Sequence, residues 1–234
     1  SRLLELLAWS QKNDKHFGSL DTIISGTEKF PEARLKEAIH FFGPIISVGY
    51  GMVEALPPIS MHSPKDYKKL DSVGKVVKGV QAKVSEDGKL AIKSKTVCKG
   101  YLNNPEENER SFKDGWLHTN DYGYIDPDHF LYLKGRQEEI LVNDPRMIFA
   151  KEIEDAVYRL EYVDRCAALS KGEQVAIFVS LRAAMENEEV TKAIRAALGD
   201  TGILKHPVAI IIKDALPVSP LGKLDKRKLL QEIP

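Results

Sequence analysis

Two side chains that could grip a polyol flank a predicted β-hairpin. Asp121 and Arg136 stand on either side of the turn signal Asp126-Pro127-Asp128. Proline presets φ and aspartate caps tight turns, while aromatic and β-branched residues at 121–126 and 129–134 favour strands. A carboxylate can accept from two vicinal hydroxyls, and a guanidinium donates in a rigid fork. Taken alone, the pair is better explained as a surface salt bridge, because such pairs are common and weak.

A second group of chemically suggestive residues follows two predicted buried strands, 20–25 and 45–50. A helix predicted over 31–42 lies between them, which favours a parallel α/β unit with ligands at the carboxyl ends of its strands. Glycine lets a flat ring approach the backbone, tyrosine can stack on a base, and a carboxylate suits Mg²⁺. Without other information, tight turns in which glycine only serves geometry are the better explanation of these residues. The residues at the two strand ends are Gly26, Thr27, Gly49, Tyr50, Gly51 and Glu54.

The C-terminal stretch LPVSPLGKLDKRKL (216–229) offers a cation, Lys223. An ammonium group is a point charge that could neutralise a carboxylate and a phosphate together. The alternative is a solvated basic tail, since Lys226, Arg227 and Lys228 follow closely.

Five stretches together resemble motifs of the adenylate-forming (AMP-binding) superfamily, which includes acyl-CoA synthetases, luciferase and peptide-synthetase adenylation domains. They occur in the family's order and span almost the whole chain, so the chain resembles the C-terminal portion of such an enzyme. The stretches are SGTEKFP (25–31), VGYGMVEA (48–55), GYLNNP (100–105), GWLHTNDYGYIDPDHFLYLKGRQEEI (115–140) and LPVSPLGKLDKRKL (216–229).

The resemblance implies a role for each residue at the strand ends and beside the hairpin. Asp121 would bind the ribose hydroxyls of ATP and Arg136 the same nucleotide. Tyr50, between Gly49 and Gly51, would pack against adenine, and Glu54 would bind Mg²⁺. Gly26 and Thr27 would lie in the loop near adenine and the acyl pocket.

The resemblance also implies an α/β plus α+β fold in two domains. Residues 1–135 would be the end of the large AMP-binding domain, with an α/β unit at about 1–70 and a β-barrel-like subdomain at about 71–135. Residues 136–234 would form a small mobile α+β domain. Glu138 would be its hinge, and Lys223 would swing into the active site.

The implied function is activation of a carboxylic acid by ATP and Mg²⁺, through acyl-AMP to a thioester with coenzyme A or a carrier-protein phosphopantetheine. Departures from the family pattern keep two alternatives open. Val53 replaces a threonine that contacts phosphate in the family, and Pro145 lies in a loop that usually contains glycine. The Ser/Thr/Gly-rich phosphate loop of the family is missing. Asn120 in place of glycine is a mild change, because asparagine tolerates a left-handed backbone. The alternatives are a non-catalytic nucleotide-binding or partner module, and an acyl-AMP ligase that loads a carrier protein. We expect this stretch alone to be inactive.

Composition narrows the class of protein further. Lys plus Arg equals Asp plus Glu at 34 each, which gives no electrostatic reason to expect nucleic acid as a partner. No apolar run approaches the ~20 residues of a membrane span. Cys98 and Cys166 are unpatterned and predict reduced core residues in a cytoplasmic protein. The start at Ser1, without an initiator methionine or a signal peptide, predicts part of a longer chain.

Overall fold

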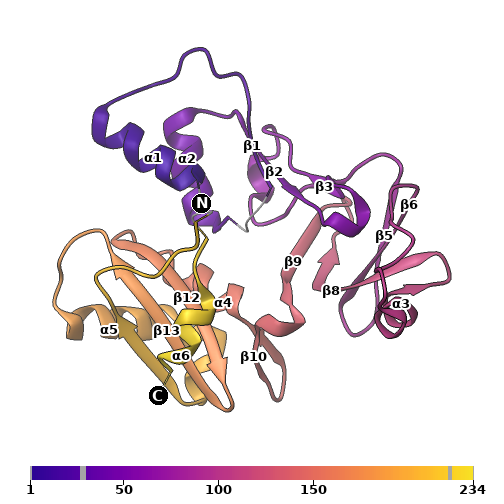
Figure 1. Ribbon diagram of the computed structural model, residues 1–234. Helices are drawn as coiled ribbons and strands as arrows, with labels where there is room; N and C mark the ends of the chain where they lie inside the picture. The colour runs from indigo at the N-terminus through magenta and orange to yellow at the C-terminus, as the bar shows by residue number, and fades with distance from the viewer. Residues whose placement is uncertain (1, 27–29, 221–222, 234) are drawn as a thin grey trace. The chain divides into compact units, whose positions relative to one another are not determined.

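The computed structural model describes residues 2–26, 30–220 and 223–233. The chain divides into two compact units, Leu3–Gln137 and Glu138–Pro234 (Figure 1). The division falls two residues beyond the position at which the sequence predicts the small domain to begin. The mobility predicted for that domain stays a prediction.

The first unit begins with a parallel strand–helix–strand element. Helix α1 (Arg2–Asn13) precedes β1 (Ile23–Ser25), α2 (Glu32–Phe42) and β2 (Ile46–Tyr50). The two strands are parallel, as predicted. The first strand is shorter than the predicted 20–25, because Leu20 instead donates its backbone N–H to Phe17 in a turn.

Two short antiparallel strands, β3 (Ser60–Met61) and β4 (Lys75–Val76), extend this sheet in the order β1-β2-β3-β4. Between them lies the 3₁₀ turn η2 (Tyr67–Lys69). Helices α1 and α2 lie side by side in Figure 1, and their apolar faces share one core with the sheet. Its buried members are Leu3, Leu7, Phe30, Leu35, Ala38, Ile46, Val48 and Leu70.

The rest of the first unit is β-rich. Its elements are β5 (Val80–Val84), β6 (Lys89–Ser94), α3 (Pro105–Ser111), β7 (Phe112–Lys113), β8 (Trp116–Ile125) and β9 (Leu131–Arg136). The predicted Asp87-Gly88 turn joins β5 to β6, and the turn around Pro127 joins β8 to β9 in the predicted antiparallel hairpin.

The expected β-barrel-like closure of this region is wrong. β5 forms one edge of the sheet, β7 and β9 pair with the other side of β8, and no ladder among the described residues joins the two edges. Ala55 and Ile59 come from the segment after β2, which includes the 3₁₀ turn η1 (Val53–Ala55), and pack in one core with Leu90, Ile92, Leu117 and Leu131. This cover removes the apolar residues from water without closure of the sheet.

The second unit is an α+β fold. Its strands are β10 (Ile140–Asn143), β11 (Met147–Phe149), β12 (Val163–Lys171), β13 (Gln174–Leu181) and β14 (Val208–Ile212). Its helices are α4 (Ala150–Val157), α5 (Asn187–Ala197) and α6 (Lys226–Gln231), with 3₁₀ turns η3 (Gln137–Glu139), η4 (Gly199–Thr201) and η5 (Ile203–Lys205). β12 and β13 are antiparallel and β14 is parallel to β13. Val175–Ser180 are all buried, so both faces of the central strand are covered.

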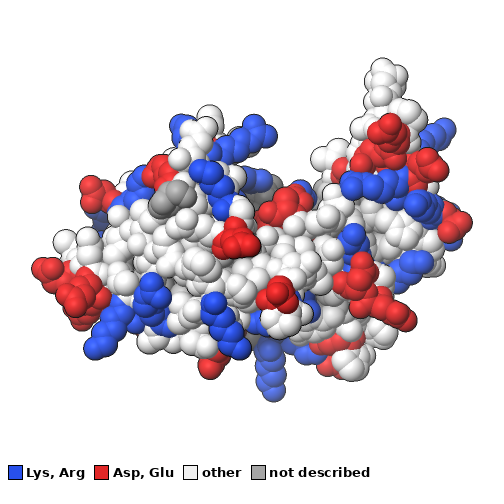
Figure 2. All heavy atoms as spheres, turned by 90° about the horizontal axis from the view of Figure 1, so that it is seen from below, with Lys and Arg blue, Asp and Glu red and all other residues white. Residues whose placement is uncertain are grey.

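The surface carries both signs of charge. In Figure 2 blue and red side chains are interspersed on the face shown, with no continuous region of one sign. Among the described residues, no helix is both long and apolar enough to cross a membrane. Cys166 is buried as expected, whereas Cys98 is exposed, because it follows the turn that ends β6.

Two neighbouring leucines of α6 give a test of this core. Leu229 is 0% exposed and Leu230 is 37% exposed. We expect Leu229→Ala to lower the free energy of unfolding by about 2–5 kcal/mol, because it removes buried methylenes and leaves a cavity. Leu230→Ala, the matched control, should cost less than about 1 kcal/mol. Urea unfolding of both variants measures the difference, and equal costs would contradict the packing of α6.

Candidate functional site

The carboxyl ends of β1 and β2 meet in the first unit. Ser25 pairs with Val48, and a Cβ added to Gly26 would lie 3.4 Å from the carbonyl oxygen of Gly49. The predicted convergence of these two strand ends is therefore confirmed. Thr27, predicted beside Gly26, lies outside the described residues.

Glycine at position 51 is required by packing. A Cβ there would lie 2.3 Å from Cβ of Pro57, closer than atoms approach in proteins. A Cβ at Gly49 would lie 3.2 Å from the flexible Met61 side chain and 3.5 Å from the carbonyl oxygen of Ser60, which is an ordinary contact. The space beside Gly51 is thus filled by the protein itself, which favours the geometric explanation for this glycine.

One carboxylate joins the end of β2 to the β8–β9 hairpin. The Tyr50 hydroxyl donates to Oδ2 of Asp121 at 2.5 Å, and Nε of Arg136 lies 3.2 Å from Oδ1 of the same carboxylate. Asp121 and Arg136 are direct cross-strand partners, so the hairpin register places them together. Tyr50 comes from 71 residues away. The two groups singled out separately in the sequence form one site.

Asp121 is held from its backbone side as well. Its N–H donates to Oγ1 of Thr119 at 3.1 Å, and that hydroxyl donates to the carbonyl of Leu90 at 2.8 Å. The Asp121 side chain is only 9% exposed, whereas that of Arg136 is 56% exposed. The carboxylate is therefore fixed, and the guanidinium is more than half exposed to solvent.

Burial, and then the adjacent Asp121 carboxylate, raises the pKa of Tyr50 far above its usual value of 10.0. Removing the phenol from water disfavours tyrosinate, and a neighbouring negative charge disfavours it further. The phenol consequently stays a hydrogen-bond donor to Asp121 throughout the physiological range.

Glu54, the predicted magnesium ligand, lies in η1 and is held by Tyr101. The Tyr101 hydroxyl donates to Oε1 of Glu54 at 3.0 Å, and the Cys98 N–H donates to the Glu54 carbonyl at 2.7 Å. Burial, followed by the hydrogen bond to Glu54, raises the pKa of Tyr101 to about 12. The adjoining Val53 side chain is 92% exposed and offers no donor. Tyr101 was missed as a site residue, although it stands in the GYLNNP motif.

The Glu54 carboxylate fits a magnesium ion that takes most of its ligands from water and substrate. Among the described residues, no group of three or more His, Cys, Asp and Glu side chains is placed to hold a metal. Mg²⁺ typically takes one or two protein carboxylates and completes its shell with water and substrate phosphates. The residues present therefore fit an ion held largely by a nucleotide, and not a dedicated protein cage.

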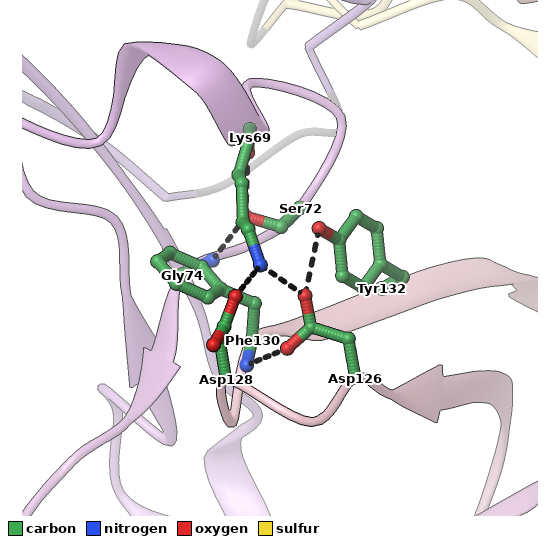
Figure 3. Close-up of polar contacts among 7 residues, drawn as sticks. All are labelled: Lys69, Ser72, Gly74, Asp126, Asp128, Phe130 and Tyr132. Carbon is green, nitrogen blue, oxygen red and sulfur yellow. Dashed lines mark hydrogen bonds and ion pairs between the residues drawn. The ribbon is translucent and has the colours of Figure 1, made fainter.

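A charged cluster fixes the tip of the hairpin that carries Asp121 and Arg136 (Figure 3). Nζ of Lys69 lies 2.5 Å from Oδ2 of Asp126 and 2.6 Å from Oδ2 of Asp128. Tyr132 donates to Asp126 at 3.2 Å, and the other oxygen of Asp126 accepts from the N–H of Phe130 at 2.9 Å. The sequence predicted the Asp-capped turn, but it gave no signal for Lys69, which lies 57 residues away from Asp126.

The remaining predicted residues belong to the second unit. Glu138 lies in η3 at the start of that unit, and Lys223 is exposed in the loop before α6. The cluster of Tyr50, Asp121 and Arg136 is thus built entirely within the first unit.

Comparison with known proteins shows which family the chain resembles. Residues 1–102 match the model of a family described as AMP-binding enzyme. The chain is 32% identical to a medium/long-chain-fatty-acid–CoA ligase of Mycobacterium tuberculosis, over 97% of this chain and 44% of that protein. Residues 1–102 are therefore similar to AMP-binding enzymes. Over almost its whole length, the chain is similar to acyl-CoA ligases.

Two solved structures share the fold. The o-succinylbenzoate CoA synthetase of Bacillus subtilis, in complex with its acyl-adenylate intermediate, superimposes with a TM-score of 0.79 and 26% identity, over 97% of this chain and 49% of that one. An anthranilate CoA ligase in complex with anthranoyl-AMP gives 0.85 at 22% identity, over 99% and 48%. The chain therefore spans about half the length of the relatives it matches. The family match lies in its first 102 residues and does not extend to its end.

The pKa shift of Tyr50 predicts a pH dependence. Below pH 10 the neutral phenol of Tyr50 stabilises the fold; above it, unfolded Tyr50 ionises while folded Tyr50 stays protonated, so wild-type stability falls. The loss from one such group is about 1.4 kcal/mol per pH unit. The Tyr50→Phe variant lacks the titrating phenol and therefore this pH-dependent loss of stability. We expect it to be about 1.5–3 kcal/mol less stable at pH 7, because it loses a hydrogen bond to a charged group.

Urea unfolding of wild type and Tyr50→Phe from pH 7 to pH 11 measures this effect. The stability difference between them should narrow above pH 10. A difference that stays constant across the whole range would contradict the buried phenol–carboxylate bond.

Proposed function

We propose that this chain is the C-terminal half of a ligase that activates a carboxylic acid with ATP. The observation that carries the proposal is the meeting of Tyr50, Asp121 and Arg136 at one point. The motif order supports the C-terminal placement, since the two strand ends come first, the hairpin follows and the lysine-bearing tail comes last. The acyl-CoA ligases among its relatives support the reaction class.

The geometry suits a ribose. A carboxylate has about four lone-pair positions. Tyr50 takes one on Oδ2 and Arg136 one on Oδ1, so two remain for the vicinal hydroxyls of a nucleotide. Because the carboxylate is fixed by its neighbours, little side-chain entropy is lost when a ligand binds. The guanidinium of Arg136 is 56% exposed beside this carboxylate and would contact the same nucleotide.

The proposed reaction has two steps. A carboxylate oxygen of the acid attacks the α-phosphorus of ATP, and pyrophosphate leaves with the electron pair of the broken P–O bond. A thiolate of coenzyme A or of a carrier-protein phosphopantetheine then attacks the acyl carbon, and AMP leaves. Lys223 would place its positive charge beside the attacking carboxylate and the α-phosphate, and Glu54 would hold the Mg²⁺ that neutralises the pyrophosphate. Glu138 would serve as the hinge between the two steps.

Two residues that depart from the family pattern, Val53 and Pro145, favour a second function. Val53 points into solvent and cannot donate to a phosphate. Pro145 has no N–H and cannot offer its backbone to a pantetheine arm. A module that binds nucleotide without turnover would tolerate the first change. A ligase that hands its acyl group to a carrier protein would tolerate the second.

Asp121→Asn tests the nucleotide site directly. The isosteric amide keeps an acceptor for Tyr50 but loses the charge and one acceptor, so we expect AMP to bind about 10–100-fold more weakly. Titration calorimetry of AMP into this chain measures the change. Asp164→Asn, at an exposed position of β12, is the matched control and should bind like wild type. Equal affinity in all three proteins would refute the role of Asp121.

Lys223→Ala tests turnover in the longer protein that contains this chain. Acid-dependent exchange of pyrophosphate into ATP should fall by at least about 100-fold, because a charge that stabilises the transition state is lost. Undiminished exchange would remove Lys223 from the mechanism, and absence of exchange in the wild type would favour the non-catalytic alternative. Free coenzyme A and a phosphopantetheine-bearing carrier protein, compared as acceptors, separate the two thiols.

A further inference from the structure

The basic residues of the C-terminal tail are not equivalent. Lys223, Arg227 and Lys228 are exposed, as a solvated basic tail would require. Lys226 is the exception, with a side chain only 36% exposed and two carboxylates beside it. Lys226 is thus partly buried between two carboxylates, whereas exposed Lys228 lies 3.9 Å from the single carboxylate of Asp225.

The two carboxylates come from different elements of the second unit. Nζ of Lys226 lies 3.0 Å from Oε1 of Glu139, in the 3₁₀ turn η3, and 3.8 Å from Oε1 of Glu154, in α4. That same oxygen of Glu154 accepts from the N–H of Ala168 in β12 at 3.1 Å. One ammonium thus joins α6 to the first residues of the unit and to its central sheet.

The charge state of Lys226 agrees with this arrangement. Burial acts to lower the pKa of Lys226, but the charges of Glu154 and Glu139 outweigh it, so the pKa is raised above its usual value. The ammonium form is therefore the one that the site stabilises.

The loop that bears Lys223 is attached firmly to the same helix. The Ser219 N–H donates to the carbonyl of Lys223 at 2.7 Å, and the Asp225 N–H donates to the carbonyl of Pro217 at 2.8 Å. Asp225 then caps α6, where its Oδ1 accepts from the N–H of Lys228 at 3.3 Å. Buried Leu229 anchors the helix in the core. A displacement of α6 would consequently move Lys223.

We propose that Lys226 is a positioning residue that joins the Lys223 loop to Glu139, so that both move as one body when the chain bends at Glu138. The catalytic consequence of this inference rests on the proposed function, whereas the contacts of Lys226 do not depend on it. Because Glu139 directly follows the predicted hinge residue, its ion pair with Lys226 keeps it with the second unit. Bending is then confined to the residues before it, and Lys223 keeps a fixed distance from the pivot.

Hydrogen exchange of the purified chain tests the linkage without any activity. In Lys226→Ala, amides in 137–143 and in 215–225 should both exchange about threefold to fivefold faster, because a partly buried ion pair that joins them is lost. Lys226→Arg keeps the charge and should restore most of the protection. Arg227→Ala removes the exposed basic side chain next to Lys226 on the same helix and should leave both segments unchanged.

A double-mutant cycle assigns the partner. If Lys226 acts through Glu139, Lys226→Ala should add little to the exchange rates of Glu139→Gln, since residues that share one interaction are not additive. Faster exchange in 215–225 alone, with 137–143 unchanged, would overturn the proposal, and so would an equal effect of Arg227→Ala.

The catalytic consequence is measured in the longer protein. Lys226→Ala should lower kcat for pyrophosphate exchange about tenfold while the AMP dissociation constant stays at the wild-type value. A drop in AMP affinity instead would contradict a positioning role. If the wild type shows no exchange, the proposed function fails, but the hydrogen-exchange result still decides whether Lys226 joins the two segments.

Discussion

The burial of the Asp121 carboxylate is the constraint around which the first unit is built. A buried charge without partners is costly, and breaking such a pair can destabilise a protein by about 3–5 kcal/mol. Asp121 obtains its partners from β2 and β9 while it lies on β8. The parallel sheet, the hairpin and the open β-rich sheet must therefore keep their mutual positions for this one group to be satisfied. A site that a ribose could use follows from the same requirement, because a fixed carboxylate with spare lone pairs is a ready acceptor.

The Lys69 cluster extends this constraint to the far end of the hairpin. It joins the turn at Asp126 and Asp128 to η2, which lies between β3 and β4. The rings of Phe130 and Tyr132 pack at the same turn, with Nζ of Lys69 4.6 Å from the centroid of Phe130. The hairpin is thus held at its tip by Lys69 and near its open end by Tyr50. A two-stranded hairpin alone is marginally stable in water, and this one is supported by the pairing of β8 with β6 and by these two attachments.

Local pattern predicted the elements well, whereas long-range partners required the structure. The parallel unit around α2, the turns at Gly88 and Pro127, and the strands β12–β14 all follow from periodicity and turn residues, which act over a few positions. Tyr101 beside Glu54 and Lys69 beside Asp126 join residues 47 and 57 positions apart, and no local signal encodes such a pairing. The barrel expectation failed for a related reason. Strand count and spacing do not reveal that Ala55 and Ile59 cover the apolar face, and a covered face removes the need for closure.

The basic tail shows how the same composition can hold two different roles. From the sequence, Lys223, Lys226, Arg227 and Lys228 form one charged run, and a run of this kind usually stays solvated. The helical repeat separates them. Lys226 lies three residues before buried Leu229, which places both residues on the buried side of α6. A lysine on that side needs carboxylate partners, and Glu139 and Glu154 supply them. Lys223 stands outside the helix in a loop and remains exposed. Exposure is what a lysine must keep if it is to reach a substrate, and half-burial is what a lysine needs if it is to fix the position of that loop.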